Sequence, residues 1–157
     1  MKKTISVLVE NHFGVLTHVS GLFSARGFNI DSLTVGETED PTISRMTIVV
    51  DGDEKTLEQV KKQLNRLIDV IKVIDLTKED FIDRELVLVK LAIDAKNRSE
   101  ILQIVDTFQA NMDDVKKDSA IIEVTGDQSK IKSFIEILKP FGIIEIVRTG
   151  RIAMGRK

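Results

Sequence analysis

The residues best placed to do chemistry form a short polar loop, Asn11-His12-Phe13-Gly14, between a strand-like run and a helical pattern. The first N–H groups of a helix lack intrahelical partners and carry partial positive charge, so a carboxylate binds well there. Gly14 permits a positive φ and lets a ligand approach the backbone. The side-chain amides of Asn11 and Asn29 offer donors and acceptors, which suits a zwitterion. On these residues alone, a simple turn in which Asn11 satisfies its own backbone is favoured over a binding site.

Residue sets for metal binding and catalysis are not evident. His12 and His18 are six apart, which does not match the i, i+4 spacing of two zinc-binding imidazoles on one helical face. There is also no HExxH motif and no cysteine, so we predict no metal site. The segment DGDEKTLEQV begins like a calcium loop, but the twelfth position is Lys62, and Asp53 is expected to cap a helix. No GxSxG, GxGxxG or phosphate loop occurs, so we predict no catalytic residue.

Composition argues against nucleic acid and membrane as partners. The 157 residues carry a net charge of −2, whereas nucleic-acid binders usually have a basic surplus. RNA recognition motifs stack bases on aromatic strand residues, but the chain has no Tyr or Trp. The apolar run in MKKTISVLVEN is too short for a signal or membrane segment, so a cytoplasmic protein is expected. The C-terminus is interpreted as a basic tail, with Arg148, Arg151, Arg156 and Lys157.

Hydrophobic periodicity predicts the order β-α-β-β-α-β, and predicts it twice. The first set has strands at 4–9, 28–35, 43–50 and 70–76, with helices marked by the apolar positions of 15–23 and 57–67. The second has strands at 84–93, 112–117, 119–125 and 142–148, with helices marked by 101–108 and 131–138. The predicted fold is α+β, two ferredoxin-like βαββαβ domains in tandem. We predict the domains at 1–76 and 84–157, joined by a linker over 77–83.

In this fold the helices cover one face of each sheet, so the other face needs polar residues or a partner. Leu8 and Val49 point away from the alternating apolar positions of their strands. We therefore predict that the chain associates with a second copy of itself.

Longer segments resemble a known family. The stretch VLVENHFGVLTHVSGLFSARGFNIDSLTV, followed by SRMTIVVDGD and EQVKKQLNRLIDVIKV, closely resembles the regulatory small subunits of acetohydroxyacid synthase, also called acetolactate synthase. The resemblance continues through ILQIVDTFQANMDDV, IIEVTGD and FIEILKPFGIIEIVRTGRIAM, so it spans essentially the whole chain. It implies that the N-terminal domain is an ACT domain.

The resemblance also implies a function in branched-chain amino-acid biosynthesis. Such a chain is not catalytic itself. It binds a catalytic large subunit that carries thiamine diphosphate, magnesium and FAD, raises its activity and confers feedback inhibition by valine. The effector lies between the ACT domains of a homodimer. The matching positions for effector binding are Asn11, Gly14, Val15 and Leu16 of one chain with Asn29 and Ile30 of the other.

Two positions depart from the family pattern. The residue before Gly14 is often proline and here is Phe13, and position 18 is often arginine and here is His18. Without the proline the loop is less restrained before binding, which lowers affinity, whereas Phe13 could add an apolar wall. The alternative function is an ACT-type amino-acid sensor that regulates another enzyme.

Overall fold

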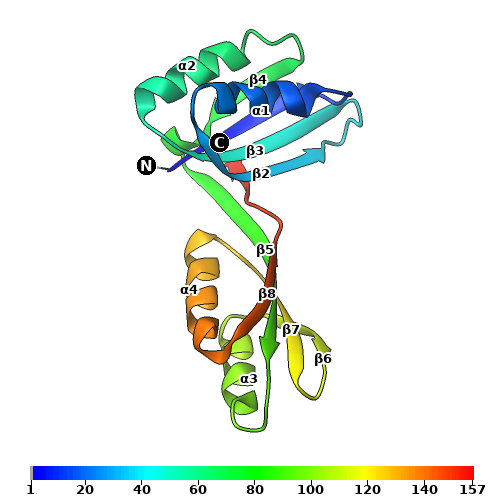
Figure 1. Ribbon diagram of the computed structural model, residues 1–157. Coiled ribbons are helices and arrows are strands. Elements are labelled where there is room, and N and C mark those ends of the chain that lie inside the picture. The colour runs from blue at the N-terminus through cyan, green and yellow to red at the C-terminus, as the bar shows by residue number, and fades with distance from the viewer. Residues whose placement is uncertain (1) are drawn as a thin grey trace. The chain divides into compact units, whose positions relative to one another are not determined.

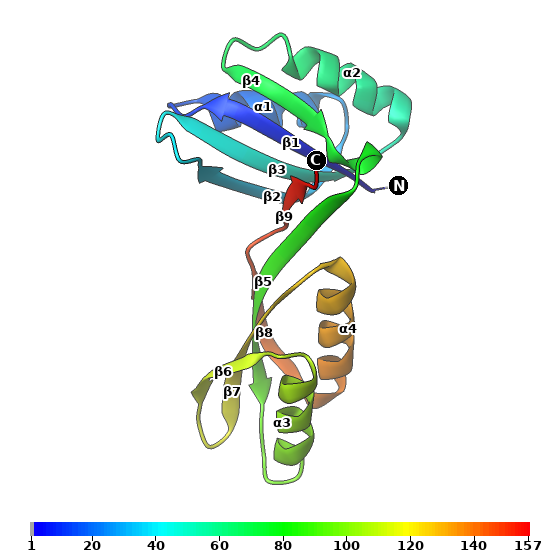
Figure 2. The same ribbon diagram turned by 180° about the vertical axis from the view of Figure 1, so that it is seen from behind.

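The computed structural model describes residues 2–157 and divides them into two compact units. The first unit contains the residues up to 82 together with 151–157, and the second contains 83–150. In each unit an antiparallel sheet carries two helices on one face (Figures 1 and 2). The predicted α+β fold with two ferredoxin-like βαββαβ repeats is confirmed.

The first unit has the strand order β2-β3-β1-β4, which leaves β2 and β4 as edge strands. Ile5, Val7 and Val9 alternate onto the helix-bearing face of the sheet and join one core with Phe23 and Leu57 of the helices. The elements are β1 (Lys2–Glu10), α1 (Val15–Ala25), β2 (Asn29–Glu37), β3 (Ile43–Asp51), α2 (Glu54–Leu64) and β4 (Val70–Asp75).

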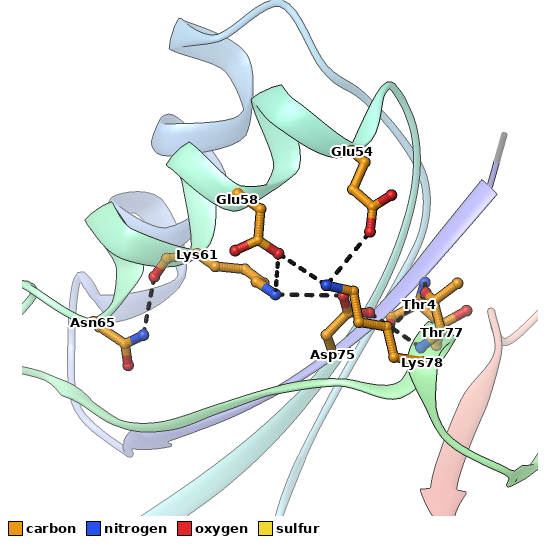
Figure 3. Close-up of polar contacts among 8 residues, drawn as sticks. All are labelled: Thr4, Glu54, Glu58, Lys61, Asn65, Asp75, Thr77 and Lys78. Carbon is orange, nitrogen blue, oxygen red and sulfur yellow. Dashed lines mark hydrogen bonds and ion pairs between the residues drawn. The ribbon is translucent and has the colours of Figure 1, made fainter.

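Polar contacts cap the start of helix α2 and hold the helix in place. As predicted, Asp53 caps it, accepting a hydrogen bond of 2.7 Å from the Thr56 N–H. Farther along the helix, Lys61 lies between Glu58, at 2.7 Å, and Asp75 of β4, at 3.4 Å (Figure 3). The Asp75 side chain is only 7% exposed, so Lys61 neutralises a nearly buried carboxylate. These contacts fix α2 against the end of β4.

A short 3₁₀ helix, η1 (Leu76–Lys78), follows β4 directly. The Asp75 carboxylate accepts the Thr77 N–H at 3.1 Å, and the Thr77 hydroxyl accepts the Thr4 N–H at 2.8 Å (Figure 3). These two bonds anchor the segment to β1.

The face of the first sheet that carries no helix is polar and largely buried. Thr4, Ser6 and Thr47 are each at most 5% exposed, and the Ser6 hydroxyl accepts a hydrogen bond of 2.7 Å from Arg45. The C-terminal strand β9 (Ile152–Gly155) pairs with β5, and the Arg151 N–H before it donates to the Ser32 hydroxyl at 2.8 Å. The chain's own C-terminus thus covers part of this face.

The division into units differs from the predicted one at two places. Residues 77–83, predicted to be a linker, contain η1 and the start of β5 (Phe81–Ala92). The C-terminal residues 151–157, predicted to be a basic tail of the second domain, belong to the first unit. Arg156 is bonded there, since its N–H donates to the Asp80 carbonyl at 3.0 Å and its guanidinium lies 3.2 Å from the Asp80 carboxylate.

The second unit repeats the pattern with the strand order β6-β7-β5-β8. Val87, Val89 and Leu91 of β5 form its core with residues such as Phe134 of α4. Its remaining elements are α3 (Arg98–Thr107), β6 (Asn111–Val115), β7 (Ser119–Gly126), α4 (Gln128–Leu138), η2 (Lys139–Phe141) and β8 (Ile143–Arg148).

Candidate functional site

The loop between β1 and α1 has the backbone conformation predicted from the sequence, with a positive φ at its glycine. Gly14 is the residue before the helix and has φ +89°, a conformation that L-residues other than glycine rarely adopt. No side chain caps the helix, and its first turn has no acidic residue. Within residues 2–157 the N–H groups of Leu16 and Thr17 have no hydrogen-bond acceptor. The start of α1 therefore presents unpaired donors to an anion.

Asn11 links this loop to the turn between β2 and β3. Its side-chain amide donates to the Pro41 carbonyl at 3.0 Å and to the Glu37 carboxylate at 3.3 Å. Its own N–H donates to the Thr42 carbonyl at 2.7 Å. The simple turn, in which Asn11 would satisfy only its local backbone, is not what the structure shows. Asn11 instead holds a carboxylate, that of Glu37, beside the loop, and the effector site predicted from the sequence does not include that residue.

The apolar residues at the start of α1 divide into two kinds. Val15 is 3% exposed and packs in the core, so only its backbone can meet a ligand. Leu16 is 46% exposed and Phe13 fully exposed, so both side chains can contact a bound molecule. Nothing occupies the space beside Gly14 within ordinary contact distance except the edge of the His18 ring at 4.0 Å.

Asn29 and Ile30 lie at the other end of the sheet from this loop. On β3, Asn29 pairs with Asp51 while Glu10 pairs with Ile43. Those two β3 positions are eight residues apart, roughly 27 Å along a strand. One chain therefore does not bring Asn11 and Asn29 together. Within the chain, the Asn29 amide donates to the Asp31 carboxylate at 3.1 Å.

A second cluster beside the loop was missed from the sequence. His12 Nε2 lies 2.8 Å from Asp69 Oδ1 and 3.4 Å from Glu10 Oε2, and His18 Nδ1 lies 3.7 Å from Asp69 Oδ2. The Phe13 carbonyl bonds to the ring and raises the pKa of His12, and the Asp69 and Glu10 carboxylates raise it further. The histidine spacing gave no sign of this cluster because the i, i+4 rule applies within a helix and His12 precedes α1. No local pattern marks Asp69 as its neighbour.

No helix within residues 2–157 is long and apolar enough to cross a membrane.

Comparisons with known proteins match both units. Residues 84–157 match the family described as the small subunit of acetolactate synthase, and residues 5–72 match the AHAS small subunit-like ACT domain. The chain is 54% identical over 156 residues to a probable acetolactate synthase small subunit of Archaeoglobus fulgidus, covering 99% of this chain and 98% of the relative. It is 50% identical over 153 residues to the acetolactate synthase small subunit of Mycobacterium leprae, covering 98% and 90%.

Solved structures agree with these matches. The crystal structure of an acetolactate synthase small subunit from Thermotoga maritima superposes with a TM-score of 0.90 at 44% identity, covering 100% of this chain and 98% of that one. Because the likeness is high in sequence and in fold and runs through both units, the chain belongs to the family of acetolactate synthase small subunits with an N-terminal ACT domain.

Proposed function

We propose that this chain is the non-catalytic regulatory subunit of an acetolactate synthase, also called acetohydroxyacid synthase. It binds the catalytic large subunit, raises its activity and makes it sensitive to valine. The observation that carries the proposal is the family likeness over the whole chain, to relatives that are themselves named small subunits. Thiamine diphosphate, magnesium and FAD belong to the large subunit, and the complex acts in the cytoplasm.

The effector site is shared by two copies of this chain. Strand β2 is an edge strand, so one side of its backbone is free to pair with a second β2. Antiparallel pairing about a two-fold axis near Leu33 sets Asn29 of one chain beside Glu37 of the other. Glu37 is hydrogen-bonded to Asn11 of its own chain. The pairing of the two β2 strands therefore brings Asn29 of one chain close to Asn11 of the other.

The groups at this junction match the parts of valine. The N–H groups at the start of α1 receive the carboxylate, and Gly14 keeps the approach free of a Cβ. Glu37 supplies a negative charge for the ammonium group. The half-exposed Leu16 of one chain and Ile30 of the other contact the isopropyl group. The amides of Asn11 and Asn29 complete the hydrogen bonds.

Regulation follows from a shift between two arrangements of the dimer. Valine contacts both chains, so it stabilises the arrangement in which the two halves of the site are closest. The catalytic subunit responds to that arrangement through the surface that it binds. Valine can shift the equilibrium only by the difference between its affinities for the two arrangements.

The test is reconstitution with the catalytic large subunit from the same source. A tagged large subunit should retain this chain during purification, and adding the chain should raise the rate of acetolactate formation. Valine should lower the rate of acetolactate formation by the complex. It should have a smaller effect on the rate of the large subunit without this chain. Acetolactate formation by this chain alone, or a rate unchanged by adding it, would contradict the proposal.

A further inference from the structure

Four side chains converge beside the β1–α1 loop: Glu10 ends β1, His12 is in the loop, His18 is on α1, and Asp69 precedes β4. One ligand atom from each of Glu10, His12 and Asp69 lies within 4.8 Å of the others. The backbone holds two of these residues in register, because the Glu10 N–H donates to the Asp69 carbonyl at 2.8 Å. The cluster is therefore built by the fold.

The hydrogen bonds of His12 favour its use as a ligand. Its Nδ1 lies 3.3 Å from the Phe13 carbonyl, so a proton on Nδ1 donates there. That tautomer leaves a lone pair on Nε2, and Nε2 faces two carboxylates. Metal-binding histidines commonly show this pattern, in which the outer ring N–H donates to a carbonyl and the inner nitrogen binds the ion. Without an ion, a proton on Nε2 makes these two contacts, and a metal ion would bind in place of that proton.

We propose that Glu10, His12 and Asp69 form a binding site for a divalent transition-metal ion of the zinc type. Zinc binds imidazole nitrogen and carboxylate oxygen at about 2.0–2.2 Å, which separates two ligand atoms by about 3.4 Å in a tetrahedron. The His12–Glu10 pair already has that separation, at 3.4 Å. The His12–Asp69 pair, at 2.8 Å, must open by about half an ångström to admit the ion.

The surroundings suit an exchangeable ion. The side chains of His12 and Glu10 are each about half exposed, which leaves a path for the ion from solvent. The Asp69 side chain is only 19% exposed, so it is the most firmly packed of the three ligands. His18 keeps a second imidazole within 3.7 Å of the other Asp69 oxygen. Nitrogen and carboxylate ligands together favour a transition metal over magnesium or calcium. This inference does not depend on the proposed regulatory function.

The test is calorimetric titration of Zn²⁺ into the full chain, made without a polyhistidine tag and freed of metal with a chelator. With only two histidines and no cysteine in the sequence, few other zinc sites can form. We expect about one ion per chain. His12→Ala and Glu10→Gln should each weaken binding at least about tenfold. Glu37→Gln is the matched control, a carboxylate beside the same loop but outside the cluster, and should leave zinc affinity unchanged.

Thermal unfolding separates lost ligands from lost folding. Zn²⁺ should raise the Tm of the wild type and of Glu37→Gln, since an ion that binds only the native state stabilises it. It should leave the Tm of a folded His12→Ala chain unchanged. Absence of zinc binding by the wild type, or equal affinity in the wild type, His12→Ala and Glu10→Gln, would overturn the proposal and leave the cluster as a hydrogen-bonded ion group.

Discussion

The two units share one topology but close the loop after their first strand differently. In the second unit the loop between β5 and α3 contains Asp94. Its carboxylate accepts hydrogen bonds from the N–H groups of Lys96 and Asn97 at 2.8 and 2.9 Å. The first turn of α3 also contains Glu100. The loop before α1 has Gly14 and no acidic residue in the first turn. The same framework thus provides its own anion in one unit and leaves a place for a ligand's anion in the other.

The sheet faces without helices also differ. In the first unit small polar residues such as Ser6 and Thr47 are buried, and the C-terminal strand covers part of the face. In the second unit Val147 of β8 pairs with Leu88 on the corresponding face and is 55% exposed. Ile144, at the irregular position of the same strand, is 58% exposed. Among the regularly paired residues, the helix-free face is thus better covered in the first unit, whereas both units expose an isoleucine at the irregular position of their edge strand, Ile71 at 51% and Ile144 at 58%.

The largest expected effect comes from adding an acidic side chain to the loop before α1. Gly14→Asp places a negative charge and a Cβ where we propose that the valine carboxylate binds, so valine affinity should fall by at least about a hundredfold. Its matched control is Gly142→Asp in the second unit, where φ is also +89°. Both should lose about 1–2 kcal/mol of stability through backbone strain, but only Gly14→Asp should lose valine binding. Calorimetry and denaturant unfolding measure the two quantities.

The second-largest effect compares the first residues of two edge strands, β2 and β6. Asn29 begins β2 and Asn111 begins β6, each an edge strand of its sheet. Asn29→Ala removes an amide that we expect to bond a charged group of valine, and such a bond is worth about 1.5–3 kcal/mol. Valine affinity should fall roughly ten- to a hundredfold, while Asn111→Ala should leave it unchanged. Equal effects of the two variants in calorimetric titrations would show that the site is not at β2.

A third difference concerns how the second helix of each unit is held. Lys61→Ala leaves the nearly buried Asp75 without its cation, which should cost about 1–3 kcal/mol of unfolding free energy. Lys132 of α4 is exposed and, within residues 2–157, has no ion-pair partner. Lys132→Ala should therefore change stability by less than about 0.5 kcal/mol. Urea unfolding of both variants decides whether α2 is more dependent on charge than α4.

The smallest effect is on acid stability. Lys61, and then Lys78, bond to Glu58 and lower the pKa of its carboxyl. A lowered carboxyl pKa stabilises the native state above the unfolded value of about 4.3, and this contribution is lost as pH falls through the folded pKa. Glu58→Gln should therefore weaken the decline of stability in acid, measured by urea unfolding between neutral and acidic pH. Glu136→Gln, on the exposed part of α4, should leave that decline unchanged.

Sequence periodicity was sufficient for the repeated elements, because strands such as β1 and helices such as α2 carry clear apolar patterns. It missed β9, a four-residue strand whose pairing depends on a segment about seventy residues away. The positive φ of Gly14 was foreseen from its place in a strand–loop–helix pattern. The bond from Asn11 to Glu37 and the contact of His12 with Asp69 were not, since both join residues distant in the chain.

The central claim is that two chains share one valine site, and complementation between variants tests it most directly. Gly14→Asp and Asn29→Ala chains are unfolded together, refolded as a mixture and titrated with valine. In a mixed dimer one site takes the intact loop from the Asn29→Ala chain and the intact Asn29 from the other. Random pairing should then restore wild-type affinity at about a quarter of the wild-type number of sites. A mixture that binds valine no better than its two components would contradict a site shared between chains.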